Sequence, residues 1–269
     1  MSAFARKVAA LADVREERIE RLAGGDLSEV LLVHRADGRA MVAKGGPAIA
    51  TEASMLRALL AAGAPTPLVE AEHDGVLFIE HVPNDGIFSP AAWRDIGTKL
   101  RQLHDGTAEQ YGWPVDYRLG TVELDNRRSG DWPAFWGVQR LAATAAVLDR
   151  PWRERIDPLV ARLPGLLPAA PRPSHLHGDL WTGNILVAEG KLAALIDPAC
   201  YHGDAEVDLA MLHLFGEPPD TFIEAYGPLA AGWEKRRPVY QLFPALVHLR
   251  LFGAAYAAMV DRLLTGIGF

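Results

Sequence analysis

The sequence has little of several features that mark particular classes of protein. Its one cysteine, Cys200, excludes an intramolecular disulfide and fits a reducing compartment. Residues 1–20 mix acids and bases and hold no uninterrupted apolar segment, so we expect no signal peptide. The longest uncharged apolar run, residues 251–260, is about half of what a membrane span needs. These absences predict a cytoplasmic protein with no membrane partner.

An excess of basic residues is also missing. The chain has 27 lysines and arginines against 34 aspartates and glutamates, a formal net charge of −7. Nucleic-acid binding needs basic surfaces, so we expect no nucleic-acid partner. Local cations and backbone N–H groups can still hold an anionic ligand. The 269 residues, 49% of them hydrophobic, are enough for one large domain or two lobes with a full core.

The first part of the chain predicts a lobe of about five strands. Apolar runs on both sides of Asp37-Gly38 predict a β-hairpin, and two more strands flank the turn at residues 73–75. Residues 24–28, GGDLS, predict a tight bend after a short strand. Two helices are also expected. One covers residues 4–18, and the other begins at Pro47 and ends near Gly63, with an apolar face formed by Ile49, Ala53, Leu56 and Leu60.

The rest of the chain predicts a larger, mainly helical lobe. After an expected hinge at residues 81–86, Ser89-Pro90 is a typical helix start and predicts a helix through His104. Further helices are predicted near residues 131–148, 151–163 and 239–264, the last buried on several sides. We therefore expect an α+β fold of two lobes, residues 1–83 and 84–269.

One segment places many polar side chains directly before an apolar strand. Residues 175–187, HLHGDLWTGNILV, contain Asp179 and Asn184, and Asp197 follows the partner strand of the same predicted hairpin. Antiparallel pairing returns Asp197 close to Asn184. Their oxygens suit Mg²⁺, and Asp179 is then free to accept a proton from a substrate hydroxyl. The alternative is that each residue only caps a turn.

A second set of residues suits a phosphate chain. Lys44 ends an apolar strand, where an unpaired lysine would be costly, and Glu52 in the following helix can reach it. Gly24 and Gly25 would let the backbone approach phosphate oxygens closely. The alternatives are a lysine that extends to water and a glycine pair that only turns the chain.

Taken together, these motifs resemble those of the protein-kinase-like fold. The spelling HGDLWxGN followed by IDPA is similar to its small-molecule kinase branch, which includes the aminoglycoside and choline phosphotransferases. Segments 111–126, 131–141, 197–211 and 248–256 narrow the resemblance to the fructosamine kinase (ketosamine-3-kinase) family, over nearly the whole chain. The resemblance implies an enzyme that uses ATP and Mg²⁺ to phosphorylate a sugar hydroxyl of a ribulosamine or fructosamine adduct, a deglycation activity.

The resemblance also implies roles for individual residues. Asp179 would be the catalytic base, and Asn184 and Asp197 would be the Mg²⁺ ligands. Lys44 would contact the phosphates of ATP with Glu52 as its ion-pair partner. The other residues expected to bind ATP are Gly24, Gly25, Leu27 and Ser28 in the glycine-rich loop and Glu80, His81 and Val82 at the hinge.

Three residues near the catalytic aspartate have further expected roles. The indole of Trp181 can offer a flat apolar wall to a sugar ring or a substituted amine, and the alternative is a core tryptophan under the hairpin. His177 is expected to hydrogen-bond backbone and fix the loop. Asp208 is expected to accept backbone N–H groups of the loop that carries Asp179 and Asn184, which is called the catalytic loop below.

The sequence departs from the family pattern at two positions. Some members have a cysteine in the glycine-rich loop where this chain has Asp26, so redox-controlled dimerisation through that loop is not expected. Leu124 stands where a more polar residue is usual, which bears on fine substrate specificity. His175, His202 and His213 show no metal-binding spacing.

Two other functions stay open at this point. One is phosphorylation of an aminoglycoside, choline or homoserine by the same fold, although the scattered acids of the second lobe are unlike a pocket for a polycation. The other is nucleotide binding without catalysis, which the intact set Lys44, Asp179, Asn184 and Asp197 disfavours. The amine carrier of the substrate and the oligomeric state are not predictable from the sequence.

Overall fold

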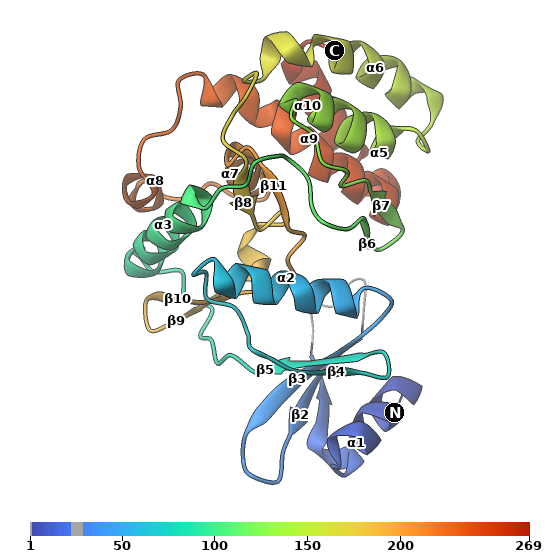
Figure 1. Cartoon of the computed structure of the whole chain (residues 1–269), viewed down its shortest axis with the longest axis vertical. Coiled ribbons are helices and arrows are strands. Elements are labelled where there is room, and N and C mark those ends of the chain that lie inside the picture. Colours follow the sequence, from blue (N-terminus) through green and yellow to red (C-terminus); the bar gives the residue numbers. More distant parts are fainter. Residues whose placement is uncertain (1, 23–28) are drawn as a thin grey trace.

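Five short strands form the antiparallel sheet of the N-terminal lobe in the computed structural model, which describes residues 2–22 and 29–269 (Figure 1). The predicted bend at residues 24–28 lies outside the described residues. The predicted hairpin turn is confirmed, with Gly38 at a φ of +83° that favours glycine. In the sheet order β1-β2-β3-β5-β4, the strands are β1 Ile19–Arg21, β2 Val30–His34, β3 Ala40–Gly45, β5 Val76–Glu80 and β4 Val69–His73.

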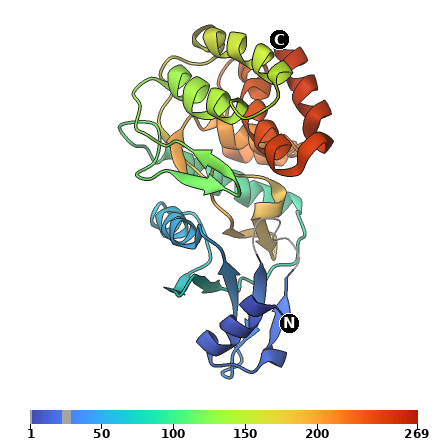
Figure 2. The ribbon, with the colours of Figure 1, turned by 90° about the vertical axis from the view of Figure 1, so that its right-hand side faces the viewer.

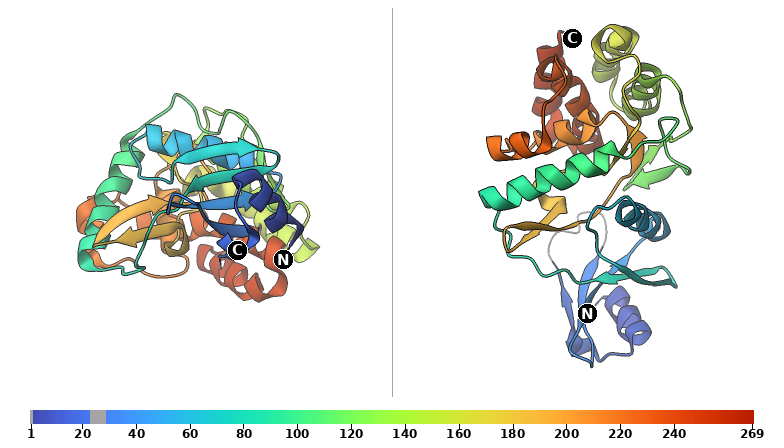
Figure 3. Two further views of the ribbon diagram at one scale, coloured as in Figure 1. Left: turned by 90° about the horizontal axis from the view of Figure 1, so that it is seen from below. Right: turned by 60° about the vertical axis from the view of Figure 1, so that its left-hand side comes forward.

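One helix covers each face of this sheet. Helix α1, Ala3–Ala12, packs on one face through Val8, against Leu31 and Val33. Helix α2, Ile49–Ala61, packs on the other face and lies between the sheet and the C-terminal lobe (Figures 1 and 3). Alternating side chains of the strands supply the two small cores.

Two helix expectations need correction. Helix α1 ends at Ala12 and not at residue 18, because Asp13 takes a left-handed conformation with a φ of 50°. Leu60 of α2 is 43% exposed and does not belong to the buried face. This helix buries two neighbouring stripes, one on the sheet and one on the C-terminal lobe, the latter through Met55 and Leu59.

The C-terminal lobe is mainly helical, and its helices confirm the predicted ones. The expected helices near residues 131–148 and 151–163 are present, although much of the first is wound as a π-helix, η2. The helices are α3 Pro90–Asp105, α4 Trp132–Ala134, η2 Phe135–Ala142, α5 Ala143–Ala145, α6 Arg150–Leu166, η3 Thr182–Asn184, α7 Glu206–Leu212, α8 Asp220–Tyr226, α9 Trp233–Phe252, η4 Gly253–Tyr256 and α10 Ala257–Ile267; the short 3₁₀ turn η1 Glu16–Arg18 belongs to the first lobe.

Three two-stranded sheets complete the C-terminal lobe. The predicted hairpin after the polar segment is confirmed as β9 Ile185–Ala188 and β10 Lys191–Leu195. Two other pairs were not expected from the sequence. They are β6 Tyr117–Leu119 with β7 Val122–Leu124, and β8 Ser174–Leu176 with β11 Tyr201–Gly203.

The C-terminal helices form a packed pair. By length and composition alone, the stretch Trp233–Ile267 could cross a membrane, with a mean hydropathy of 1.4. The chain turns at Gly253, and α10 packs back against α9 (Figure 2). Core helices pass the same test, so this stretch is weak evidence for a membrane span. The predicted burial holds for α9, whereas α10 buries only Val260 and Leu264.

Candidate active site

The base of the β9–β10 hairpin brings the three predicted oxygen-bearing side chains to one place. The backbone N–H of Ile196 donates to the carbonyl of Asn184 at 3.0 Å, which sets Asp197 beside the end of the catalytic loop. The Asn184 side-chain N–H groups donate to the backbone carbonyl and to the carboxylate of Asp179, at 2.8 and 3.0 Å. The amide oxygen of Asn184 is therefore the group left for a cation.

The surroundings of Asp179 favour a proton acceptor. Burial, opposed by the hydrogen bond from Asn184 and reinforced by the charge of Asp197, raises the pKa of Asp179 to about 6. A carboxylate with a raised pKa is a stronger base than an exposed one and still ionised at neutral pH. The pKa of Asp179 is therefore in the range that suits a general base.

Lys44 joins the two lobes. Its ammonium forms ion pairs with Glu52 of α2 and with Asp197, and its side chain is nearly buried. Burial alone would lower the pKa of Lys44, but the charges of the two carboxylates outweigh it and raise that pKa. Lys44 is thus held as a cation next to Asp197, whose own φ of 53° is unusual outside glycine. Backbone strain of this kind is frequent at functional sites.

The side chain of Asp208 holds the catalytic loop in place through hydrogen bonds. This fully buried carboxylate accepts the backbone N–H groups of His177 and Gly178 at 2.7 and 2.8 Å. It also accepts a hydrogen bond from Nε2 of His104 at 3.1 Å. Burial would raise the pKa of Asp208, but its hydrogen bond from His104 and the neighbouring donors hold that pKa below its usual value. The sequence pointed to Asp208 but not to His104, which looked like an ordinary residue at a helix end.

The side chain of His177 fixes the loop from the other direction. Its Nε2–H donates to the carbonyl of Ile196 at 2.9 Å, and its Nδ1 accepts the backbone N–H of Asp179 at 3.3 Å. Next to it, Gly178 has a φ of +83°, and a Cβ there would lie 1.9 Å from the carbonyl oxygen of Ala199. The loop therefore packs backbone against backbone on the turn that carries Asp197.

Asn184 and Asp197 have the donor chemistry of a magnesium site. Mg²⁺ takes hard oxygen ligands and usually keeps several waters, so one carboxylate with one amide oxygen is a sufficient protein contribution. In the described part of the chain, no group of three or more His, Cys, Asp or Glu residues is arranged to hold a metal. Consistent with this, His175 and His202 pack against Trp113.

The residues expected at the nucleotide pocket are placed only in part. Gly24, Gly25, Leu27 and Ser28 lie outside the described residues. Glu80 is the last residue of β5, and His81 and Val82 follow it where the chain leaves the sheet. The carboxylate of Glu80 accepts the backbone N–H of Leu68 at 3.2 Å, and the carbonyl of Val82 accepts a hydrogen bond from Asn84 at 3.4 Å.

Trp181 lies at the surface of the site. Its indole is 38% exposed and covers Gly183, where a Cβ would lie 2.3 Å from the ring. The centre of the Trp181 ring also lies 5.8 Å from that of Phe215. The alternative of a core tryptophan is therefore wrong.

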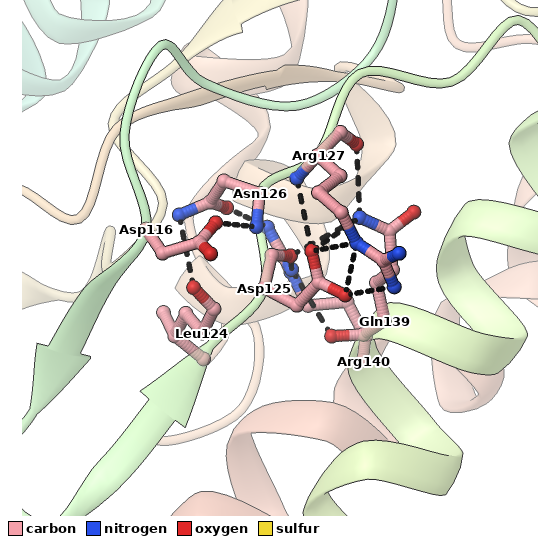
Figure 4. A network of polar contacts seen from close by, with 7 residues as sticks. All are labelled: Asp116, Leu124, Asp125, Asn126, Arg127, Gln139 and Arg140. Carbon is pink, nitrogen blue, oxygen red and sulfur yellow. Dashed lines mark hydrogen bonds and ion pairs between the residues drawn. The ribbon is translucent and has the colours of Figure 1, made fainter.

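A polar network that the sequence did not reveal centres on the buried Arg140 and the segment 125–126 (Figure 4). The fully buried guanidinium of Arg140 donates to the side-chain oxygen of Asn126 at 2.7 Å and to the backbone carbonyl of Asp125 at 2.8 Å. Its carbon lies 4.3 Å from the ring centre of Tyr201. Nearby in β6, the hydroxyl of Tyr117 donates to the backbone carbonyl of Ala199 at 2.6 Å, two residues after Asp197.

The sequence feature that could have revealed this network is Arg140, an arginine within the apolar pattern of the helix predicted near residues 131–148. Leu124, the residue expected to bear on specificity, is 2% exposed and belongs to the main core. Cys200 is fully buried in the same core, as a small hydrophobe would be.

Known proteins of similar sequence carry kinase names. Two relatives are named probable ketoamine kinases. The one from Vibrio parahaemolyticus is 30% identical over 88% of this chain and 87% of its own length. The one from Thermus thermophilus is 34% identical over 90% of each chain. A protein-ribulosamine 3-kinase of Arabidopsis thaliana is 34% identical over 60% of this chain and 53% of its own. The chain spans 65% and 61% of the Enterococcus faecium and Synechocystis relatives, both also named probable ketoamine kinases.

Solved structures agree with the fold. A crystal structure of a candidate fructosamine-3-kinase from Thermobifida fusca superimposes with a TM-score of 0.85 at 30% identity and covers 98% of both chains. The gentamicin complex of the phosphotransferase APH(2'')-IIa gives a TM-score of 0.63 at 14% identity, covering 99% of this chain and 96% of that one, which shows the fold alone. The sequence profile of the fructosamine kinase family matches residues 5–267, and the chain belongs to this family.

Proposed function

We propose that this protein transfers the terminal phosphoryl group of ATP to a sugar hydroxyl of a ketosamine. The names of its relatives support an alcohol-directed kinase of this class. The observation that carries the proposal is the meeting of Lys44, Asp179, Asn184 and Asp197 between the lobes. We also propose that the acceptor is the hydroxyl on the third sugar carbon; a phosphate there would make the adduct labile, so the reaction would serve deglycation.

In the proposed mechanism, the protein supplies positioning, charge and one base. The carboxylate of Asp179 takes the proton of the acceptor hydroxyl. The oxygen of that hydroxyl forms a bond to the terminal phosphorus of ATP, and the bond between this phosphorus and the oxygen of ADP breaks. Lys44 neutralises charge on the phosphate chain, with Glu52 holding it in place. Asp208 and His177 keep the loop in the geometry that presents Asp179 to the hydroxyl.

Asn184 and Asp197 would hold Mg²⁺, which would supply positive charge to neutralise the phosphate chain of ATP. In the structure, Lys44 is paired with Asp197. The nucleotide phosphates would give Lys44 new anionic partners and leave Asp197 for the metal. The glycine-rich loop, residues 24–28, and the hinge residues Glu80, His81 and Val82 are proposed to contact the rest of ATP. We also propose a cytoplasmic location and an N-terminal lobe bounded at residue 83.

The decisive test is the variant Asp179→Asn. It keeps the hydrogen bonding shape of the loop but removes the base, so turnover should fall by roughly 10²–10⁴-fold while ATP binding persists. Phosphate transfer to a fructosamine and to a ribulosamine is measured with and without the substitution, and ATP binding by titration calorimetry. Unchanged turnover would remove Asp179 from this role.

A substrate panel separates the remaining alternatives. Wild-type protein with ATP is offered a ribulosamine, a fructosamine, kanamycin and choline. Transfer to kanamycin or choline but to neither ketosamine would assign the protein to another phosphotransferase of the same fold. Thermal stabilisation by ATP without transfer to any of the four would favour a nucleotide-binding module.

A further inference from the structure

A continuous row of aromatic side chains leads from the catalytic loop onto the C-terminal helices. Ring centres lie 5.8 Å apart for Trp181 and Phe215, 5.2 Å for Phe215 and His248, and 5.5 Å for His248 and Phe252. Tyr256 completes the row, with its ring 4.9 Å from His248 and 5.8 Å from Phe252. These five residues are called the aromatic strip below.

The backbone fixes the shape of the strip. His248 and Phe252 are one turn apart on α9 and so lie on the same face of the helix. Nδ1–H of His248 donates to the carbonyl of Pro244 at 2.8 Å, which sets the plane of the ring. Gly253 then ends α9 with a φ of +75°, and the 3₁₀ turn η4 folds Tyr256 back onto both rings.

Three of the five strip residues are exposed and the other two, His248 and Tyr256, are half-buried, whereas the aromatic core of the same lobe is buried. Phe215 and Phe252 are 42% and 41% exposed, close to the value for Trp181, whereas Trp132 and Trp136 are fully buried. Contiguous exposed apolar groups with a polar rim often mark binding sites. The strip begins at Trp181, whose backbone carbonyl accepts the N–H of Asn184 at 2.9 Å, and the side chain of Asn184 donates to the carboxylate of Asp179. This end of the strip therefore adjoins the proposed acceptor site.

The chemistry of a ketosamine matches this layout. Its amine nitrogen is joined to the first sugar carbon, so only two carbon atoms separate the nitrogen from the carbon that carries the acceptor hydroxyl. When that hydroxyl lies at Asp179, the charged nitrogen is within reach of the face of Trp181, which attracts cations. Any group on the nitrogen then continues away from the sugar, toward Phe215.

We propose that the aromatic strip binds the amine carrier of the ketosamine and selects aromatic or bulky apolar carriers over small ones. This inference rests on the proposed function, because it extends the same acceptor site. Four of the five side chains are a tryptophan, two phenylalanines and a tyrosine, which offer flat stacking area and no fixed charge. A carrier with a ring is the occupant that gains most from such a surface.

The test compares two fructosamines that share the sugar and differ only in the amine, one made from benzylamine and one from methylamine. In the wild type, we expect KM for the benzylamine adduct to be lower by roughly three- to tenfold, the size of one or two ring contacts. Phe252→Ala and Phe215→Ala should bring the ratio of the two KM values close to one, with a smaller effect on kcat. Phe252→Tyr keeps a ring and should keep the ratio.

A matched control removes exposed apolar surface elsewhere in the lobe. Val147 is 67% exposed, and Val147→Ala should leave the KM ratio as in the wild type. Equal wild-type KM values for the two adducts would overturn the strip assignment and leave the proposed function standing. A Phe252→Ala effect of the same size on both adducts would also overturn it, because that pattern indicates a structural role. Transfer to neither adduct would overturn both proposals.

Discussion

At the residue scale, Asp208 shows how much depends on one buried carboxylate. Its oxygens accept hydrogen bonds from two backbone N–H groups of the catalytic loop and from His104. Hydrogen bonds to a charged acceptor are stronger than neutral ones, and their loss leaves buried donors without partners. In the proposed function Asp208 touches no reacting group, and its contribution would be to position Asp179.

The variant Asp208→Asn should lower the free energy of unfolding by about 2–4 kcal/mol. The new NH₂ group faces N–H donors and cannot accept from all of them. Urea denaturation measures the change, with Asp261→Asn as the control. Asp261 is exposed and paired with Arg155, and its substitution should cost less than about 1 kcal/mol. Similar losses for the two variants would contradict the proposed brace.

His175 and His202 form a second residue-scale feature, two rings on the paired strands β8 and β11 with centres 5.2 Å apart and planes tilted by 50°. They face each other in the β8–β11 register and both contact the ring of Trp113. Burial, reinforced by the charge that His202 carries when protonated, lowers the pKa of His175 to about 4. Burial also lowers the pKa of His202. Both rings are therefore neutral at pH 7.

This pair predicts a loss of stability on acidification. An unfolded histidine titrates near pH 6.5, so the stability linked to a depressed folded-state pKa is present above pH 6.5 and is lost as the pH falls toward 4. For His175 the loss between pH 7 and pH 5 is up to about 2 kcal/mol. His175→Leu should reduce the drop in melting temperature over that range. The exposed control His73→Gln should not, and an unchanged drop in His175→Leu would contradict the prediction.

At the scale of elements, close packing of two helices depends on one glycine. Gly97 lies in the middle of α3, and a Cβ there would be 2.6 Å from the backbone carbonyl oxygen of Phe222 in α8. The glycine lets the backbones of α3 and α8 approach each other. Helix α3 also carries His104, which donates a hydrogen bond to Asp208. The contact between α3 and α8 therefore helps to position the carboxylate that binds the backbone of the catalytic loop.

Two matched glycine substitutions test this packing. Gly97→Ala should destabilise the protein by roughly 1–3 kcal/mol, because the added methyl group must push two backbones apart. Gly165→Ala in α6 has open space around it and should stabilise by about 0.5–1 kcal/mol, since alanine is the better helix former. Denaturation of both variants measures the two signs. Stabilisation by Gly97→Ala would show that the helices do not need this contact.

At the scale of the whole molecule, the site is assembled from both lobes. Besides the Lys44–Asp197 pair, the sulfur of Met55 in α2 accepts the backbone N–H of Cys200 at 3.4 Å. The carbonyl of Pro65 accepts the backbone N–H of Leu195 at 2.8 Å. The turn that carries Asp197 is therefore held from the N-terminal lobe as well as from its own lobe.

Nucleotide binding at this junction should stabilise the fold. A ligand at 100 times its dissociation constant adds about 2.7 kcal/mol to the free energy of unfolding. We expect ATP with Mg²⁺ to raise the melting temperature more than ATP with a chelator. In Asp197→Asn this metal-dependent increment should largely disappear, while Asp261→Asn should retain it. An unchanged increment in Asp197→Asn would exclude Asp197 as a metal ligand.

Local patterns predicted much of the fold and part of the site. The turn at Gly38 and the cap at Ser89 follow from short-range backbone chemistry, and the β9–β10 hairpin forms as its alternating apolar residues indicate. Leu60 was misplaced because periodicity finds an apolar face but not where that face ends. The three-residue strands β6, β8 and β11 are too short to show a period.

The amino-acid sequence by itself determined which residues are candidates for the chemistry, because carboxylates, an amide and a lysine are the side chains that can bind cations, bind phosphates and accept protons. Only the tertiary structure decided how they meet. The pairing of Lys44 with Asp197, the bracing of His177 by Asp208, and the aromatic strip each join residues far apart in the chain. Such contacts arise from packing, which depends on the shapes of all neighbouring elements and not on any local pattern.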